Sequence, residues 1–403
     1  MQIVVVSPFL DRRHGTELCI IEQIERLSSK YGWGIHLFSQ RVENVNGILT
    51  EAARSAATGF IRWYKVSDIP GPHLLKFLWW LFANQSLRKR ALKGIKDCSL
   101  LVYTPGINCL DANVIAVHMV FHEFYASIRP EIALHRIPVS KWPVVLHRRL
   151  YYRLIMALER RIYTDPKVRL VAVSKLVATQ LQKHFGRTDS VVISNAVDTQ
   201  RFSFKARLAR RSASRKSLKL DDGDFVVLLI GNDWKKKGLD QSLRALAGIN
   251  DIPIQLLVVG KDDPGLYRTA LQQLRLEDRV RFLVPSADVL LFYSAADAYI
   301  APSLEDAFGL PIIEAMACGL PVIASVRAGA SENILDGTTG YLLQDPTNYT
   351  ELAESIQRLA HDRSVAERVG AAAAQYVQAS LSWDDNTSDL CRFLESSSGP
   401  MRS

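Results

Sequence analysis

The chain has 403 residues, of which 48% are hydrophobic and 23% are charged, which suits about two globular domains and excludes wholesale disorder. Its net charge of +9 is unevenly distributed, because residues 1–220 carry a net of +20 and residues 221–403 a net of −11. The basic half predicts a polyanionic partner, and nucleic acid, anionic lipid and phosphorylated glycans all qualify. A solvated basic surface is the alternative.

The cysteines and the apolar segments bear on the compartment. Five cysteines are scattered without a C-x-x-C pair, which favours reduced thiols over a disulfide framework or a zinc site. The first ten residues, MQIVVVSPFL, are typical of a β-strand and lack the features of a signal peptide. The longest apolar stretch, residues 73–85, contains a lysine and is shorter than the roughly 20 residues of a spanning helix. We therefore expect a cytoplasmic protein without a spanning segment.

Strands and helices alternate along the first half. Residues 2–9 are an apolar run, residues 16–32 have apolar side chains at helical spacing and end on Gly32, and residues 34–40 form the next predicted strand. Further β-branched runs are typical of parallel strands buried on both faces: residues 99–106, 113–119, 168–174 and 190–197.

The domain boundary is predicted from composition. Residues 203–222 have few large apolar side chains and, counted from Arg201, eight basic ones, which indicates a linker or an exposed helix. A second strand–helix series follows, so we expect two doubly wound parallel sheets with a cleft between them. The expected division is a domain at 1–205, a basic linker at 206–222, a domain at 223–380, and a C-terminal helix at 381–403 that packs back toward the first domain.

The segment 304–325, LEDAFGLPIIEAMACGLPVIAS, predicts a loop, a short helix and a strand. Pro311 suits the first helical turn and Gly319 lies past its end. The backbone N–H groups from about Phe308 to Leu310 would be unpaired at the positive end of the helix dipole. This helix start therefore suits a phosphate group or sugar hydroxyls.

Two carboxylates flank this helix start. Glu314 could accept two hydrogen bonds from a cis-diol such as that of a ribose, and Asp306 could reach a sugar hydroxyl. For each of them, a helix-capping or solvated carboxylate is the alternative.

A lysine-rich turn lies in residues 230–246, IGNDWKKKGLDQSLRAL, between a predicted strand and a helix. Lys235, Lys236 and Lys237 could neutralise a diphosphate there without a metal. A solvated turn is the alternative.

Two features of the first half also suggest binding. The loop SPFLDRRHGTE, residues 7–17, contains Gly15 but no G-x-G-x-x-G, which argues against a dinucleotide site. Its Arg12, Arg13 and His14 predict a loop that binds an acceptor phosphate.

The second feature is a pair of histidines, His118 and His122, spaced four apart. Their flanking residues match neither H-E-x-x-H nor H-x-x-E-H, so we expect no metal site. His118 ends an apolar strand, and we interpret it as a hydrogen-bonding residue of the cleft. A core histidine is the alternative.

Together these motifs resemble the GT-B glycosyltransferases of family 4, the retaining nucleotide-sugar transferases (glycosyl transferases group 1). The similarity covers roughly residues 170 to 345 and is most specific over 294–325. It implies an α/β fold of the GT-B type, in which two Rossmann-like doubly wound parallel-sheet domains face each other across a cleft.

The resemblance also implies residue roles. Glu314 would bind the nucleotide ribose, and Asp306 with the backbone of Phe308, Gly309 and Leu310 would hold the donor sugar and diphosphate. Lys237 would contact the diphosphate, with Lys236 and Asn232 beside it, and His118 would support the reaction centre. The acceptor-side loop would contribute Arg13, Gly15 and Thr16.

Three positions depart from the family pattern. Asp306 replaces the usual glutamate and has about 1.5 Å less reach. Ala307 stands where glycine is usual, and Asn232 where an arginine usually helps to hold the diphosphate. A nucleotide-sugar-binding protein with impaired catalysis is therefore the alternative function.

The function that the resemblance implies is a retaining hexosyltransferase that needs no metal or other cofactor. It would transfer a hexose from a UDP- or GDP-linked donor to a hydroxyl of a glycan or lipid-linked acceptor, of the cell-envelope polysaccharide or lipopolysaccharide type. An epimerase or a phosphorylase of the same fold is a further alternative.

Residues 73–96 favour a peripheral position on the inner face of the cell membrane. Trp79 and Trp80 precede a basic run there, which suits the interface of an anionic membrane. A core helix with a solvated end is the alternative. We expect no nucleic-acid partner, because no helix-turn-helix, zinc-finger or RNA-binding pattern is present.

Overall fold

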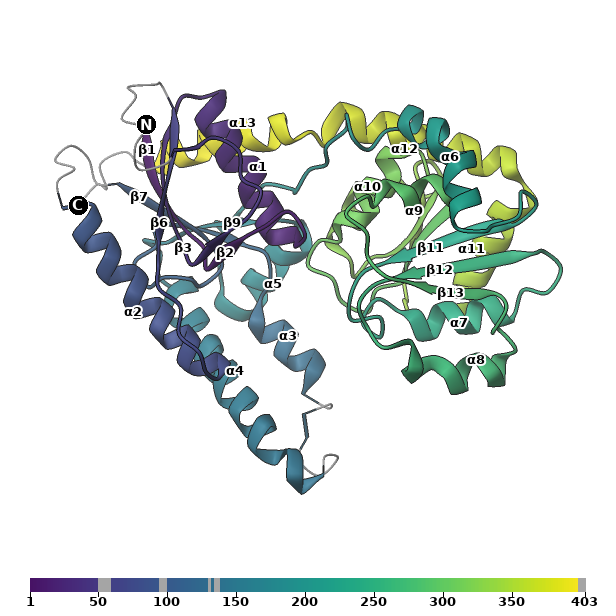
Figure 1. The fold of residues 1–403 in the computed structure, drawn as a ribbon, viewed down its shortest axis with the longest axis horizontal. Coiled ribbons are helices and arrows are strands. Elements are labelled where there is room, and N and C mark those ends of the chain that lie inside the picture. The colour runs from purple at the N-terminus through teal and green to yellow at the C-terminus, as the bar shows by residue number, and fades with distance from the viewer. Residues whose placement is uncertain (50–58, 94–99, 130–131, 134–137, 398–403) are drawn as a thin grey trace. The chain divides into compact units, whose positions relative to one another are not determined.

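The computed structural model describes residues 1–403 except 50–58, 94–99, 130–131, 134–137 and 398–403 (Figure 1). The chain divides into two units. The first unit comprises Met1–Ile193 and Asn386–Ser403, and the second unit comprises Ser194–Asp385. No described helix is long and apolar enough to cross a membrane.

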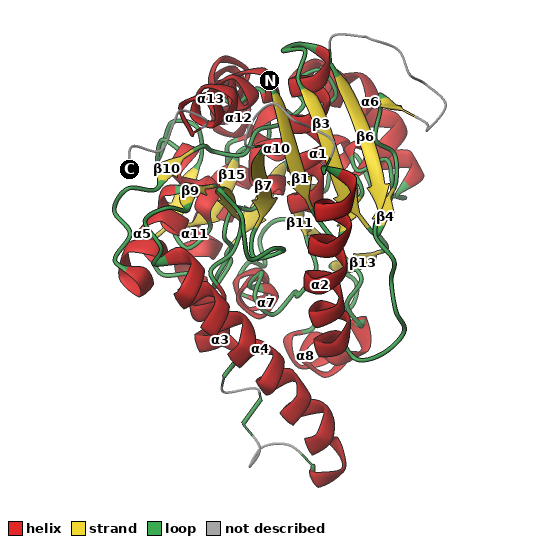
Figure 2. Ribbon diagram, turned by 90° about the vertical axis from the view of Figure 1, so that its left-hand side faces the viewer, coloured by secondary structure: helices red, strands yellow, loops and turns green. Residues whose placement is uncertain are grey.

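The first unit is built on a parallel sheet of order β10-β9-β8-β7-β1-β3-β6-β5, in which β1, β3 and β6 lie side by side (Figure 2). Apolar β-branched runs form these strands because both faces of the sheet are covered. The strands of this unit are β1 (Gln2–Val6), β3 (Gly34–Ser39), β5 (Ile48–Leu49), β6 (Phe60–Lys65), β7 (Leu101–Pro105), β8 (Val114–Val117), β9 (Arg169–Ala172), β10 (Val191–Val192), and a separate ladder of β2 (Phe9–Leu10) with β4 (Arg41–Val42).

The helices of the first unit cover this sheet. They are α1 (Gly15–Ser29), α2 (His73–Ala91), α3 (Phe121–Ile128), the 3-10 turn η2 (Val139–Lys141), α4 (Trp142–Tyr163) and α5 (Lys175–Phe185). Helix α1 contributes Ile20 and Ile24 to the core that also contains Val5 and Leu37. The C-terminal helix α13 (Trp383–Ser397) adds Leu390, Cys391, Phe393 and Leu394 to the same core.

The second unit is built on a parallel sheet of order β13-β12-β11-β14-β15-β16. Its strands are β11 (Phe225–Ile230), β12 (Ile254–Val259), β13 (Val280–Leu283), β14 (Ala298–Ala301), β15 (Val322–Ser325) and β16 (Tyr341–Leu343). Its helices are α6 (Phe204–Ser217), α7 (Leu239–Ala247), η3 (Pro264–Tyr267), α8 (Arg268–Leu274), α9 (Leu290–Ala295), α10 (Leu310–Ala317), η4 (Gly329–Asn333), α11 (Tyr349–His361) and α12 (Arg363–Ser380). Two doubly wound parallel sheets confirm the predicted fold class.

The segment predicted as a linker, 206–222, belongs instead to the second unit, where most of it forms helix α6 packed on α9. Its basic composition does not indicate exposure throughout, because Arg211 and Arg215 have partners at the end of α9. Arg211 donates to the Ala296 carbonyl and pairs with Asp297, and Arg215 donates to the Ala295 carbonyl and to Asp297 at 3.2 Å. The Arg215 side chain is only 4% exposed.

Replacing Asp297 with alanine is expected to lower the free energy of unfolding by about 3–5 kcal/mol, because the buried Arg215 guanidinium keeps its carbonyl acceptors but loses its only carboxylate partner among the described residues. It also removes the acceptor of the Val226 N–H. Urea denaturation would measure the effect. The matched control is Asp288→Ala, since Asp288 pairs with the largely exposed Arg210 and is expected to cost at most about 1 kcal/mol. Equal losses in the two variants would contradict the structural role of α6.

Candidate functional site

The lysine-rich turn and the loop before α10 meet at one edge of the second sheet. Strand β11 leads into the turn at 231–238, and its parallel neighbour β14 leads into the loop at 302–309. Loops after the carboxyl ends of neighbouring parallel strands share an edge, where such sheets bind ligands. Leu304 donates its backbone N–H to the Lys236 carbonyl at 2.7 Å, so the two segments are in direct contact.

Two glycines permit this approach. Gly238, the N-cap of α7, has a φ of 80°, and a Cβ there would lie 2.1 Å from the Pro302 carbonyl oxygen. Gly231, with a φ of 151°, ends β11, and a Cβ there would lie 2.8 Å from Cε of Lys237. The missing side chain at Gly231 therefore leaves room for the aliphatic part of Lys237.

Lys237 and Asp306 form an ion pair between Nζ and Oδ2. Both side chains are partly buried, at 23% and 16% exposure, so the pair is reachable from solvent. Asp306 Oδ1 also accepts a long hydrogen bond from the Phe308 N–H, at 3.4 Å. A diphosphate placed here would compete with Asp306 for the lysine ammonium.

The loop that carries Asp306 is held firmly. Asp306 donates its N–H to the Arg327 carbonyl at 3.0 Å, and its own carbonyl accepts from Gly329 at 2.9 Å. The carbonyl of the buried Phe308 accepts from Ala330 at 2.7 Å. Gly309, with a φ of 92°, is the N-cap of α10, which then runs from Leu310 as predicted. These contacts fix the start of the helix.

A small hollow in the second unit collects several of the predicted residues. Its lining includes Lys237, Asp306, Gly309 and Ser303. The sequence did not single out Ser303, whose buried hydroxyl has no hydrogen-bond partner among the described residues. One carboxylate oxygen of Glu305 is also buried and has no hydrogen-bond partner among the described residues. Ser303 had no signal in the sequence beyond its place in the motif.

Glu314 lies on α10 and accepts a hydrogen bond from the Tyr293 hydroxyl, 2.6 Å from its Oε2. Burial raises the pKa of Glu314, although the hydrogen bond from Tyr293 and the charge of Arg201 lower it. Burial and the neighbouring Glu314 raise the pKa of Tyr293 well above its usual range. Sequence reasoning missed Tyr293, because a tyrosine in the apolar segment of α9 carries no polar pattern.

Asn232 and Lys236 anchor the turn through contacts within the protein, in addition to offering polar groups to a bound molecule. Asn232 Oδ1 accepts from the Lys261 N–H at 3.1 Å, which ties the turn to the loop after β12. Asp262 in that loop accepts from the Trp234 N–H at 2.5 Å. Lys236 Nζ lies 3.8 Å from a carboxylate oxygen of Asp233. The side-chain carbonyl of Asn232 is therefore bound to a backbone N–H group, and only the side-chain NH₂ group could donate to a ligand.

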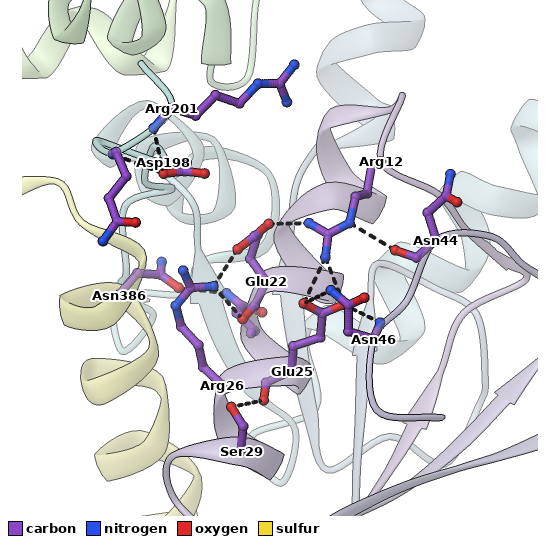
Figure 3. A network of polar contacts seen from close by, with 12 residues as sticks. Arg12, Glu22, Glu25, Arg26, Ser29, Asn44, Asn46, Asp198, Arg201 and Asn386 are labelled. Atoms are coloured by element: carbon purple, nitrogen blue, oxygen red, sulfur yellow. Dashed lines mark hydrogen bonds and ion pairs between the residues drawn. The ribbon is translucent and has the colours of Figure 1, made fainter. Parts of the chain in front are cut away.

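In the first unit, the basic residues of the loop after β1 have two different roles. Figure 3 shows the Arg12 guanidinium between Glu22 and Glu25 of α1, with both Glu25 oxygens at 2.8 Å. Arg12 also donates from Nε to the Asn44 carbonyl at 2.9 Å. Arg12 therefore braces α1, which leaves Arg13 and His14 as the exposed basic residues of the predicted phosphate loop.

Asp11 organises this loop. It is buried and accepts from the backbone N–H of Arg13 at 2.8 Å and from Nδ1 of His14 at 2.8 Å. Burial alone would raise the pKa of Asp11, but these hydrogen bonds and the nearby imidazole lower it. Gly15 begins α1, and Thr16 follows in its first turn.

His118 directly follows β8, so its loop and the Gly15 loop lie at the same edge of the first sheet, with β7 between their strands. Its Nε2 is buried and has no hydrogen-bond partner within the described ranges. Burial lowers the pKa of His118 to about 4, so the ring is neutral near pH 7. In the described part of the chain, His122 differs from His118 in having a polar partner, because His122 Nδ1 lies 2.7 Å from Glu159 Oε2.

Each unit thus holds part of the predicted set. The second unit joins Lys237, Asp306 and Gly309 in one hollow and places Glu314 on the adjoining helix. The first unit holds His118, Arg13, Gly15 and Thr16. In the part of the chain that the structure describes, no group of three or more His, Cys, Asp or Glu side chains is placed to hold a metal ion.

Known proteins resemble the chain in sequence and in fold. Residues 210–376 match the family described as Glycosyl transferases group 1. The D-inositol 3-phosphate glycosyltransferase of Rhodococcus erythropolis is 31% identical over 249 residues, which cover 54% of this chain and 55% of that protein. The lipopolysaccharide glucosyltransferase WaaG of Escherichia coli is 25% identical over 214 residues, or 51% of this chain and 57% of that protein. The chain therefore spans about half the length of these curated relatives.

Solved structures match over nearly the full length. Sucrose-phosphate synthase from Thermosynechococcus elongatus gives a TM-score of 0.74 at 20% identity and covers 98% of both chains. Anabaena Alr3699/HepE in complex with UDP-glucose gives 0.69 at 20% identity, over 98% of this chain and 100% of that one. At these identities the likeness shows the fold alone. Residues 210–376 therefore match the glycosyl transferases group 1 family, and the chain has the GT-B fold of two Rossmann-like units.

Proposed function

We propose that the protein is a retaining, metal-independent glycosyltransferase that transfers a hexose from a nucleotide sugar to a hydroxyl of a glycan or lipid-linked acceptor. The observation that carries the proposal is the Lys237–Asp306 pair at the start of α10. It offers a cation, a carboxylate and a helix N-terminus at one point, and Glu314 lies on the same helix. The family match over residues 210–376 supports it.

Each group has a task in the transfer. The Lys237 ammonium and the first N–H groups of α10 stabilise the negative charge that develops on the departing diphosphate. Glu314 accepts hydrogen bonds from the ribose hydroxyls, and Asp306 from a hydroxyl of the donor sugar. The bond from the sugar C1 to the diphosphate oxygen breaks while the acceptor oxygen bonds to C1 on the same face. The acceptor proton passes to the diphosphate, so no protein nucleophile is required.

The donor and acceptor classes follow from charge and from the relatives. UDP- or GDP-linked hexoses are the proposed donors, and one structural neighbour was solved with UDP-glucose. The net charge of +20 over residues 1–220 favours an anionic acceptor, and Arg13 and His14 offer exposed basic groups in that half. The names of both curated relatives, an inositol phosphate and a lipopolysaccharide enzyme, are in keeping with this class.

A thermal-shift panel of UDP-, GDP- and ADP-sugars tests donor binding. A donor present at about 100 times its Kd is expected to stabilise the fold by about 2.7 kcal/mol. The stabilising donor then enters a transfer assay with glycan and lipid-linked acceptors, and the anomer of the product shows whether the configuration is retained. No stabilisation by any nucleotide sugar would contradict the proposal.

The same assay separates the enzyme from a binding protein with impaired catalysis. Transfer or donor hydrolysis by the parent that disappears in Asp306→Ala supports the enzyme. Donor binding without turnover in the parent would favour the binding protein and would indicate that Asp306 and Asn232 have removed catalysis.

We further propose that the first unit contacts an anionic membrane. Of the segment predicted for this, 73–96, residues 94–96 lie outside the described range. In α2 the predicted Trp80 and Arg88 point inward, because Trp80 donates to the Asn108 carbonyl at 2.8 Å and Arg88 pairs with Asp111. The exposed apolar side chains of α2 are Leu75, Leu78 and Phe82.

Helix α4 carries a second exposed apolar stripe, formed by Trp142, Leu146 and Leu150. The first turns of α2 pack against the first half of α4 in the first unit (Figure 1). The two helices run in the same direction, since Leu74 contacts His147 and Phe77 contacts Tyr151. At 3.6 residues per turn, the exposed stripe of each helix is rotated by about a third of a turn from the side that contacts the other helix. The rotation has opposite senses on the two helices. Because the helices run in the same direction, both stripes face the same side of the pair.

Charge favours anionic lipid as the partner of this surface. Helices α2 and α4 together contain one acidic residue, Glu159, and it is buried. The exposed basic residues on or beside the two helices include Lys89, Arg90, Lys93, Lys141, Arg148, Arg153, Arg160 and Arg161. Apolar side chains that insert at the interface, with basic residues around them, suit an anionic bilayer surface.

The double substitution Leu146→Gln/Leu150→Gln is expected to weaken binding to vesicles of anionic lipid about 10-fold, because two apolar anchors are lost. Sedimentation with phosphatidylglycerol vesicles at low salt would measure it, and phosphatidylcholine vesicles should bind far less. The control is Leu266→Gln, since Leu266 is 78% exposed but lies in the second unit. Failure of the parent to sediment with anionic vesicles would contradict membrane contact and leave the transferase proposal standing.

A further inference from the structure

We propose that Glu159 is a positioning residue for His118, because its buried carboxylate fixes the backbone that carries the histidine. The inference rests on the function proposed above and on the role at the reaction centre that the family resemblance implies for His118. Glu159 is on α4, forty-one positions from His118 in the sequence, and no motif singled it out. All the residues involved belong to the first unit.

The loop that carries His118 is short and is held on its strand side. Only residues 118–120 separate the end of β8 from the start of α3. Strand β8 pairs with β7 on one side and β9 on the other, so its carboxyl end is fixed in the interior of the sheet. The position of His118 therefore depends on how α3 is held at the other end of the loop.

Helix α3 cannot hold its own N-terminus well. Its N-cap is Val120, which makes no side-chain capping hydrogen bond. Valine is among the poorest N-cap residues because it offers no acceptor for the first free N–H groups. The carbonyl of Val120 accepts from Glu123 and Phe124, but the N–H groups of Phe121 and His122 need acceptors from elsewhere.

Glu159 supplies those acceptors. Its Oε1 accepts from the Phe121 N–H at 2.7 Å and its Oε2 from the His122 N–H at 3.1 Å. The carboxylate side chain is fully buried, and its charge lies at the positive end of the α3 dipole. A side chain of the long helix α4 thus accepts two backbone hydrogen bonds from the residues that directly follow the His118 loop.

A third contact fixes the carboxylate itself. Nδ1 of His122 lies 2.7 Å from Glu159 Oε2, and the His122 ring packs against Phe185 with centroids 5.0 Å apart. Burial raises the pKa of Glu159 to about 7, although the hydrogen bonds from Phe121 and His122 lower it. Glu159 is therefore held between α3 and α5 and cannot easily move to another acceptor position.

His118 is sensitive to this arrangement because its Nε2 makes no hydrogen bond with any described residue. A side chain anchored by polar contacts would keep its place when the backbone shifts slightly, but the free end of the His118 ring follows the backbone. Displacement of a reacting group by about 1 Å can cost roughly 100-fold in rate. A cap that merely stabilised α3 would not affect the rate through His118.

The test compares Glu159→Ala with Glu159→Gln. Alanine removes the acceptors and is expected to lower kcat for sugar transfer by about 10-fold or more, with the donor KM changed less than about 3-fold. Glutamine keeps an acceptor oxygen and is expected to restore kcat to within about 3-fold of the parent. The matched control is Glu123→Gln, because Glu123 is on α3 and pairs with Lys183 and His184 but does not bind the helix start.

The double variant His118→Ala/Glu159→Ala decides whether Glu159 acts through His118. Loss of kcat no greater than in His118→Ala alone supports the proposal, since residues that act as one unit are not additive. Additive losses would overturn it and leave Glu159 as a structural cap, with the transferase proposal intact. If alanine prevents folding, Glu159→Asp, which withdraws the carboxylate by one methylene, takes its place.

Hydrogen–deuterium exchange provides a readout that does not need activity. Glu159→Ala should speed exchange at residues 119–124, while Glu159→Gln and Glu123→Gln should leave it near the parent rate. Unchanged exchange in Glu159→Ala would overturn the proposal. Absence of transfer by the parent with every donor would overturn the proposed function, and the exchange result would still show whether Glu159 holds this loop.

Discussion

Replacing Lys237 with alanine is expected to lower kcat for sugar transfer by about 100- to 1000-fold, the usual effect of removing one group that stabilises developing charge. Lys237 Nζ is the cation at the start of α10, where it pairs with Asp306 in the free protein. Without it, the diphosphate leaving group would keep only the helix N-terminus for stabilisation. Donor turnover at saturating nucleotide sugar would measure the loss.

Lys236→Ala is the matched control for this prediction. Lys236 stands one position away in the same turn, and its Nζ lies 3.8 Å from the Asp233 carboxylate. Since it is absent from the lining of the Asp306 hollow, its loss is expected to cost less than about 10-fold in kcat. Equal losses in the two variants would indicate a general effect of positive charge in the turn and would contradict a specific role of Lys237.

Stability should be almost unaffected in Lys237→Ala. The variant leaves Asp306 without its lysine, but this carboxylate is partly solvated and retains the Phe308 N–H. The free energy of unfolding is therefore expected to change by less than about 1 kcal/mol. A large loss of stability would mean that the ion pair supports the fold. In that case kcat would be measured at a lower temperature, at which the variant is folded.

The sequence predicted those features that short segments determine. Pro311 and Gly319 mark a helix, and α10 runs from Leu310 to Ala317 before β15 begins at Val322. Apolar runs such as residues 34–40 predicted strands, and β3 occupies Gly34–Ser39 of that run. Local turn and helix signals act over a few residues, so one segment contains the information that fixes them.

The partners of charged side chains could not be predicted in this way. The basic segment 206–222 indicated a linker, but its arginines meet Asp297 and the end of α9, about eighty positions later. Likewise Arg12 turns to Glu22 and Glu25, and Arg88 to Asp111. Composition reports how many charges a segment carries, whereas burial depends on acceptors that the fold brings from elsewhere.

The candidate site shows the same division. Two local motifs singled out Lys237 and the pair Asp306 and Glu314, and the resemblance to a family implied their roles. Tyr293, and Glu159 in the first unit, had no local signal because each acts through a contact with a distant segment. Such residues are found only when the side chains are placed in space.

Glu314→Gln is expected to weaken donor binding by about 10- to 100-fold, because a ribose diol that meets a carboxylate gains charge-assisted hydrogen bonds that an amide cannot replace. Glutamine keeps the size of the side chain and still offers one oxygen to the Tyr293 hydroxyl. Calorimetric titration with the donor found in the thermal-shift panel would measure the change. Tyr293→Phe is the control, since it leaves the Glu314 carboxylate in place and should cost much less affinity.

The same substitution should stabilise the free protein at neutral pH. Burial raises the pKa of Glu314 in the folded state, although the Tyr293 hydrogen bond lowers it, so folding favours the protonated carboxyl. This contribution to stability is complete below the usual glutamate range and is lost as the pH rises through the raised folded value. Glutamine is always neutral, and the free energy of unfolding of the variant should therefore exceed that of the parent near pH 7 and converge with it in acid.

A residue that costs stability while it strengthens donor binding is expected of a binding site. A variant that is less stable than the parent at neutral pH and binds the donor equally well would instead show that Glu314 serves the fold.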